Sequence, residues 1–214
     1  MCFDARSSME AFIISSVGTS MLYFSADKTK QKMSYFWISV TLIQLWEYFI
    51  WKNIDNKEKN SFWTTILRTN ISLQPLIALL ILISLPSYIP RNVLISILLV
   101  ELIVLIRLFY NIYKEHSQVT KVSYNNNLEW PQEIEDMQRG EQIFPWAVYF
   151  IVITILPWFV KPLHTGLTFG ILVTLSLILS FLKLEHFSII NSSGWRSIWC
   201  YVAASIPLIQ YIVL

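Results

Sequence analysis

The residues with the clearest chemical potential lie in the segment Gln44-Leu45-Trp46-Glu47-Tyr48-Phe49-Ile50-Trp51, within an apolar run from Met33 to Trp51. A run of this length predicts a membrane-spanning helix. A charged side chain inside a span costs several kcal/mol unless it is paired or hydrated, so Glu47 marks a candidate functional site. Gln44 lies one helical turn before Glu47 and is expected on the same face.

Two arginines are expected at the depth of Glu47. Arg68 and Arg107 lie near the same ends of the next two apolar segments. At about 1.5 Å per residue, their heights differ from that of Glu47 by only a few ångströms. Either arginine is therefore a candidate partner for the carboxylate.

A second polar layer is expected deeper in the same segments. Asn70 and Gln74 are four residues apart and share a helical face, and Glu101 lies near the middle of the following segment. Pro75 has no N–H to bond to the Ile71 carbonyl, so it predicts a kink beside this layer.

These polar residues support two interpretations. In the first, Glu47 forms an ion pair with Arg68 or Arg107 that fixes helix register, while Asn70 and Gln74 tie the spans together. In the second, the same groups line a cavity or a path for an ion, a proton or a small polar solute. A lipid-modifying membrane enzyme is a third, less favoured reading.

The composition predicts the elements that must hold these groups. Of 214 residues, 55% are hydrophobic and 14% are charged, and the mean hydropathy is +0.52. Soluble domains carry about 25% charged residues. We therefore expect one all-α domain over residues 1–214, a polytopic membrane helical bundle of six or seven transmembrane helices. The expected spans are 9–26, 33–51, 62–85, 90–110, 143–160, 165–182 and 197–214.

Proline positions predict irregularities in three of these spans. Pro75, Pro157 and Pro207 each lie inside an apolar segment, where a missing N–H interrupts the helical ladder. We expect a kink or a break at each of the three positions.

Two further patterns concern helix ends and packing. Ser7 and Glu10 have the spacing of a capping box, which predicts the start of the first helix near them. Gly166, Gly170 and Thr174 form a stripe of small residues that predicts close helix packing.

Residues 114–142 form the only long polar segment. Within it, 131–140 is expected to be a short surface helix, with Trp130, Ile134 and Met137 on one face. This segment supports an alternative function, a non-catalytic membrane-organising protein that anchors a protein partner here.

Several function classes lack the residues that they need. The histidines, His116, His164 and His186, lie in or beside polar loops and form no HExxH motif, and Cys2 and Cys200 form no CxxC motif. Walker A and GxSxG sequences do not occur. The net charge of +2 gives no support to nucleic-acid binding. We predict no metal and no cofactor; the lipid bilayer is the expected partner.

The distribution of Lys and Arg predicts the orientation. With seven spans, the N-terminus and the loops 52–61, 111–142 and 183–196 share one side, which carries more basic residues than the other side. The positive-inside rule then places the N-terminus in the cytoplasm. The basic loop around Lys28, Lys30 and Lys32 opposes this assignment.

Three groups of residues carry a resemblance. They are the segment Gln44 to Trp51, Asn70 with Leu73-Gln74-Pro75, and Gly194-Trp195 with Trp199-Cys200. In these groups the chain resembles a family of uncharacterised multi-span membrane proteins of large DNA viruses and some protists. The resemblance would cover most of the chain and implies no activity.

Overall fold

The computed structural model describes residues 4–114, 118–122, 128–129, 143–182 and 203–214. The helices are α1 (Ala5–Tyr23), α2 (Lys28–Lys52), α3 (Lys57–Ser84), α4 (Arg91–Lys114), α6 (Ile143–Phe150), α7 (Leu163–Leu182) and α9 (Ile206–Val213). A π-helix, η1 (Ile151–Ile155), and a 3₁₀-helix, η2 (Leu156–Phe159), follow α6. In the described part, the strands are limited to an antiparallel two-residue pair, β1 (Lys121–Val122) and β2 (Leu128–Glu129). The predicted all-α class is confirmed.

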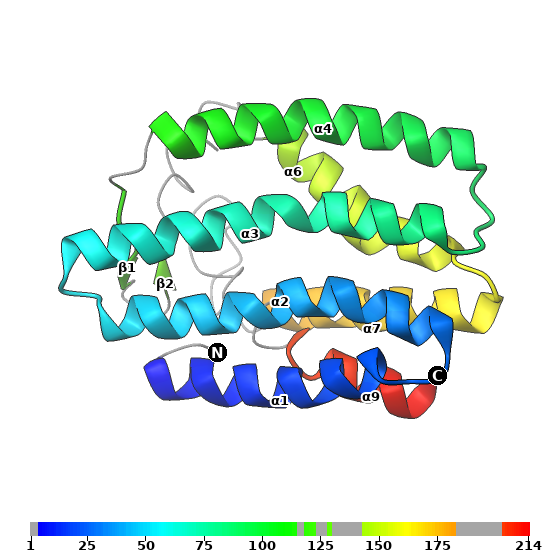
Figure 1. Cartoon of the computed structure of the whole chain (residues 1–214), viewed down its shortest axis with the longest axis horizontal. Coiled ribbons are helices and arrows are strands. Elements are labelled where there is room, and N and C mark those ends of the chain that lie inside the picture. The colour runs from blue at the N-terminus through cyan, green and yellow to red at the C-terminus, as the bar shows by residue number, and fades with distance from the viewer. Residues whose placement is uncertain (1–3, 115–117, 123–127, 130–142, 183–202) are drawn as a thin grey trace.

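The helices form two layers. α1, α2, α3 and α4 lie side by side in chain order and alternate in direction, each packed on the next (Figure 1). α7 and α9 lie behind this row, with α9 packed against α1 and α7, and η1 packed against α3. α2 has neighbours on several sides, so a polar residue on this helix can be enclosed by protein.

The first three helices begin at side-chain caps. Asp4 accepts a 2.7 Å hydrogen bond from the Ser7 backbone N–H, and the Asp4 N–H donates to the Ser7 hydroxyl. The capping box predicted for Ser7 and Glu10 was therefore wrong: Asp4 is the cap, Ser7 is its partner, and α1 starts at Ala5. Asp27 and Asn56 cap α2 and α3.

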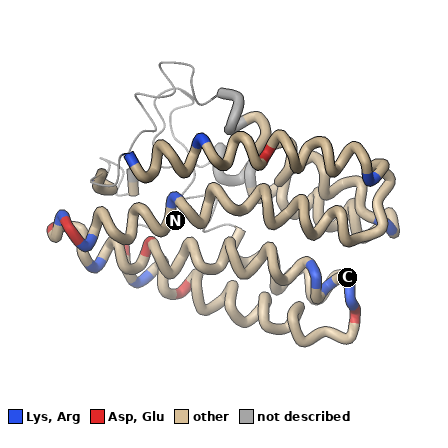
Figure 2. The backbone as a smooth tube through the Cα atoms, turned by 45° about the horizontal axis from the view of Figure 1, so that its top comes forward, with Lys and Arg blue, Asp and Glu red and all other residues tan. Residues whose placement is uncertain are grey.

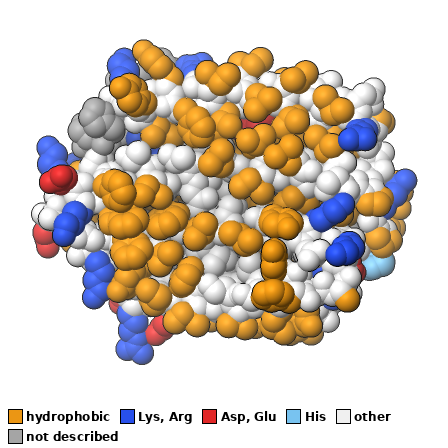
Figure 3. Space-filling model, in the orientation of Figure 1, with side chains coloured by type: hydrophobic (Ala, Val, Ile, Leu, Met, Phe, Trp, Pro, Cys, Tyr) orange, Lys and Arg blue, Asp and Glu red, His pale blue; other side chains and the backbone are white. Residues whose placement is uncertain are grey.

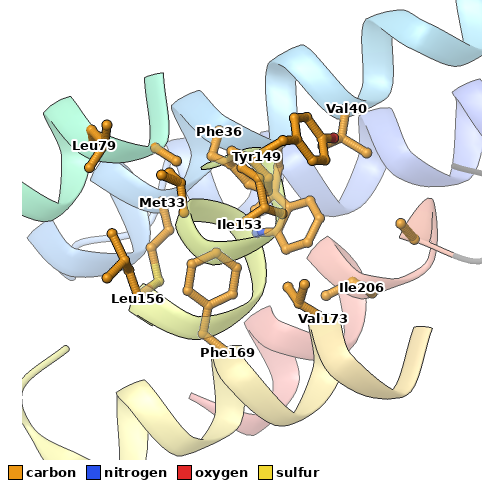
Figure 4. Packing of buried hydrophobic residues seen from close by; sticks show 14 of the residues in the cluster. Met33, Phe36, Val40, Leu79, Tyr149, Ile153, Leu156, Phe169, Val173 and Ile206 are labelled. Atoms are coloured by element: carbon orange, nitrogen blue, oxygen red, sulfur yellow. The ribbon is translucent and has the colours of Figure 1, made fainter. Parts of the chain in front are cut away.

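Apolar side chains from both layers meet behind α2. Phe36 on α2 and Phe169 on α7 pack edge to face with their ring centroids 6.1 Å apart. Ile153 from η1 and Ile206 from α9 join the same buried cluster, as does Leu79 from α3 (Figure 4). This shared core fixes the two layers relative to each other.

Glycines allow close helix approach at two positions. A Cβ at Gly18 would collide with the Leu208 backbone and lie 2.8 Å from the Pro207 carbonyl carbon, so Gly18 seats α9 on α1. A Cβ at Gly170 would lie 2.5 Å from the Trp158 ring. The stripe that contains Gly170 is thus a packing surface.

The irregularities at proline take different forms. Pro75 lies inside α3, which continues past it. Pro157 lies in the 3₁₀ segment that ends the span predicted for 143–160, and Pro207 lies in the first turn of α9. The helix over 143–160 therefore changes from α to π to 3₁₀ along its length.

Among the described residues, two helices are long and apolar enough to cross a membrane, α3 and α4. Shorter apolar stretches occur at Ala147–Phe159 and Leu163–Ser176. The short helix expected at 131–140 and the residues 197–202 of the last expected span lie outside the described residues.

Candidate functional site

Glu47 and Gln44 lie on α2 with no exposed surface. They are one turn apart on α2, which packs against α1, α3 and α9. Both side chains have interaction partners, so neither is an isolated polar group. A carboxylate and an amide thus lie buried one turn apart on α2.

The expected ion pair of Glu47 with Arg68 or Arg107 is not seen among the described residues. Within that part of the chain, the only acidic and basic side chains within 4 Å are Glu10 and Arg6, 2.8 Å apart near the start of α1. Arg68 instead donates from Nη1 to Gln118 Oε1 at 3.3 Å. Arg68 therefore helps to hold the chain segment that follows α4.

Asn70 and Gln74 connect α3 to two different neighbours. Asn70 Nδ2 donates to the Ser39 carbonyl on α2 at 3.0 Å. Gln74 is completely buried, and its Oε1 accepts a 2.5 Å hydrogen bond from the Tyr149 hydroxyl on α6. Gln74 Nε2 has no hydrogen-bond partner in the described structure. This layer therefore joins helices directly through side-chain amides.

Glu101 lies on the inner face of α4 and is only 1% exposed. Among the described residues, no hydrogen bond or ion pair is found for its carboxyl group. A buried carboxylate without a cation is energetically costly, and a protonated carboxyl group avoids that cost.

A polar contact that the sequence did not predict attaches residues 118–122 to α3. Asn60 Nδ2 donates to the Thr120 carbonyl at 3.0 Å, and the Thr120 N–H donates back to Asn60 Oδ1 at 3.0 Å. Thr64, one turn further on, shares a 2.8 Å hydrogen bond with the Thr120 hydroxyl. The four-residue spacing of Asn60 and Thr64 was the only signal for this contact in the sequence.

Two more buried polar contacts were also not predicted. Ser15 on α1 and Thr41 on α2 are joined by a 2.6 Å hydroxyl–hydroxyl bond. Trp37 Nε1 on α2 donates to Gln210 Oε1 on α9 at 2.5 Å. Both hydrogen bonds link neighbouring helices, as Ser, Thr and Gln side chains do in membrane helical bundles.

A small cavity lies among apolar side chains of α2, α3, η1, η2 and α7. Met33, Phe36, Ala78, Pro157 and Phe169 contribute to its apolar lining. Its volume of about 10 Å³ is at the lower limit for holding one water molecule. Glu47 and Glu101 do not line it.

Metal binding has no support in the described residues, where no group of three His, Cys, Asp or Glu side chains could hold an ion. His164 is exposed at the start of α7, and His116 and His186 lie outside the described residues.

Comparison with known proteins gives no relatives. No family model, no curated protein and no solved structure matches the chain.

Proposed function

We propose that the chain is a multi-pass membrane protein with six or seven spans. The support is its apolar surface, because soluble proteins rarely expose large contiguous apolar patches. Hydrophobic side chains cover much of the visible face (Figure 3). They are exposed on every long helix: Ile13 and Val17 on α1, Ile38 on α2, Leu80 on α3, Ile103 and Ile106 on α4, Leu167 and Ile171 on α7.

Most charged residues lie towards the two ends of the helices (Figure 2). This is the distribution that a protein crossing a hydrocarbon layer requires. At one end, Lys32 Nζ donates to the Ser84 carbonyl at 2.7 Å and Lys30 Nζ donates to the Tyr211 carbonyl at 3.2 Å. These lysines stabilise the ends of α3 and α9. The basic first loop was the feature that opposed a cytoplasmic N-terminus. Because Lys30 and Lys32 have a structural role at helix ends, their charge counts less against that orientation, which supports the cytoplasmic N-terminus.

The function supported best is the movement or sensing of a small ion, proton or polar solute at Glu47. The observation that carries it is the complete burial of Glu47 together with Gln44 on the central helix. Ionisable groups inside spans mark solute and proton pathways. The change from α- to π-helix at η1 adds support, because π segments occur frequently at functional sites.

The test is ion flux in proteoliposomes. Purified protein is reconstituted, and fluxes of protons, Na⁺ and K⁺ down their gradients are followed. We expect Glu47→Gln to reduce the flux of the conducted ion at least tenfold, a ratio that corresponds to about 1.4 kcal/mol. Glu10→Gln, an exposed carboxylate, is the matched control. Unchanged flux in Glu47→Gln at equal protein content would show that the site assignment is wrong.

A second candidate function is partner anchoring by residues 114–142. The observation in its favour is the attachment of Thr120 to Asn60 and Thr64, which fixes the base of this segment on α3. The test is partner capture by the whole protein, with and without residues 130–142. A partner set that survives this deletion would exclude the segment as the contact surface.

A further inference from the structure

Glu101 lies at the centre of the face that α4 turns to the rest of the protein. Leu94, Leu105 and Ile112 are buried on the same stripe, whereas Ile106 on the opposite face is 71% exposed. α3 is the main helix against which α4 packs. Glu101 is the only acidic residue on α4 and lies near the middle of its sequence.

Glu101 and the Pro75 region of α3 lie at the same height. α3 ends at Ser84 and α4 starts at Arg91, and the two helices run antiparallel. Glu101 follows Arg91 by ten residues, and Gln74 precedes Ser84 by ten. At about 1.5 Å per residue, both positions are about 15 Å from the connecting loop.

Pro75 lies on the side of α3 away from α2. Trp63 stacks on Trp46 of α2, and Asn70 bonds to α2, so these two residues mark the face towards α2. At about 100° per residue, Pro75 and Leu79 lie roughly 140–180° around the helix from Asn70. Both are buried, although they point away from α2. Besides α2, α3 packs against α4 and η1, so this side of the helix lies against those two elements.

Pro75 leaves one backbone carbonyl of α3 without its usual hydrogen-bond donor. Pro75 has no N–H, so the Ile71 carbonyl lacks the donor that its helix would normally provide. Buried carbonyl groups are almost always hydrogen bonded. An ionised carboxylate cannot help, because it only accepts, whereas a protonated carboxyl has an O–H to donate.

We propose that Glu101 is held as a carboxylic acid that donates its proton to the Ile71 carbonyl and so fills the gap that Pro75 leaves in α3. This contact supplies the missing donor and also removes the cost of a buried charge. It assigns Glu101 a role separate from the Glu47 site, and it does not depend on transport.

Infrared difference spectroscopy tests the protonation directly. The spectrum of the whole wild-type protein at neutral pH is compared with that of Glu101→Gln. We expect the wild type to show one carboxylic-acid C=O band that the variant lacks. A carboxylate band in its place would overturn the proposal. In Pro75→Ala, where residue 75 regains its N–H, the same acid band is expected to move to the position of a more weakly hydrogen-bonded acid.

A double-mutant cycle tests the link between the two helices. Replacing Glu101 by Leu is expected to lower Tm by about 2–4 °C, the effect of one hydrogen bond in a chain of this size. In the Pro75→Ala background the same replacement is expected to cost less than half as much, because the Ile71 carbonyl is already paired. Glu101→Gln, which keeps a donor, is expected to stay within about 1 °C of wild type. Equal losses in both backgrounds would overturn the assigned contact.

Discussion

Trp37 on α2 and Gln210 on α9 are joined by a buried 2.5 Å hydrogen bond, with the indole Nε1 as donor. The other end of the Gln210 amide lies 3.0 Å from the Met33 sulfur. One glutamine thus attaches the last described helix to the central one, across more than 170 residues of sequence.

Replacing Gln210 by Leu is expected to lower Tm by about 3–10 °C, because the buried indole N–H would lose its acceptor. Thermal unfolding in detergent measures the shift. Ile212→Leu is the matched control, since Ile212 is 72% exposed on the same helix. An unchanged Tm in Gln210→Leu would mean that this bond does not hold α9.

Gly18→Ala is expected to destabilise the contact of α1 with α9 by about 1–3 kcal/mol, because the added methyl meets backbone atoms that cannot rotate away. Tm, together with protease sensitivity of residues 203–214, gives the readout. Ser20→Ala, at an exposed position of α1, controls for the change in helix propensity. Equal stability of the two variants would contradict the close approach at Gly18.

Asn60→Leu is expected to release the 118–122 segment, because both hydrogen bonds between Asn60 and Thr120 are lost. We expect proteolytic cleavage within 114–142 to become at least fivefold faster, equivalent to roughly 1 kcal/mol of local stability. Lys59→Ala changes an exposed neighbour and is the control. If both variants are cut at the wild-type rate, Asn60 does not hold the segment.

The start of α1 is expected to be sensitive to acid. The hydrogen bond from the Ser7 backbone N–H lowers the pKa of Asp4 below its ordinary value. A carboxyl whose pKa is lower in the folded state stabilises the fold above its unfolded pKa, and this contribution is lost as the pH falls through the folded pKa.

The measurement compares Asp4→Ala with wild type at several pH values. The Tm difference should be present at pH 7 and should shrink below about pH 4, near the ordinary pKa of an aspartate. The comparison variant is Asp27→Ala, which removes the cap of α2. It shows whether the pH dependence of the Tm difference is specific to the cap of α1. A difference that stays constant down to pH 2 would contradict the role of the Asp4 charge.

The sequence predicted most helices because apolar runs and prolines are local signals. α2, α3, α4 and α7 all overlap the expected spans, and breaks occur near Pro157 and Pro207. The start of α1 was missed because Asp4 and Ser7 are both residue types that cap helices. Only the hydrogen bonds of the folded chain show that Asp4 is the cap and Ser7 its partner.

The partners of the interior polar residues were less predictable. Arg68 was expected beside Glu47 on the basis of depth, whereas its hydrogen bond to Gln118 involves a segment that depth does not predict. The partners in the other contacts are far apart in sequence: Asn60 bonds to Thr120, and Gln74 bonds to Tyr149. No spacing in the sequence marks either pair, so these contacts follow only from the packed structure.

The proposed membrane-spanning arrangement is tested most directly by the position of both ends of α3 and α4 relative to a membrane. Single cysteines replace Lys59, Asn92 and Lys114, all exposed, in a chain whose Cys2 and Cys200 are serine. Sealed vesicles of one orientation are treated with a membrane-impermeant maleimide. We predict that positions 59 and 114 are labelled from one side and position 92 only from the other. Labelling of all three positions from the same side would contradict the spanning arrangement.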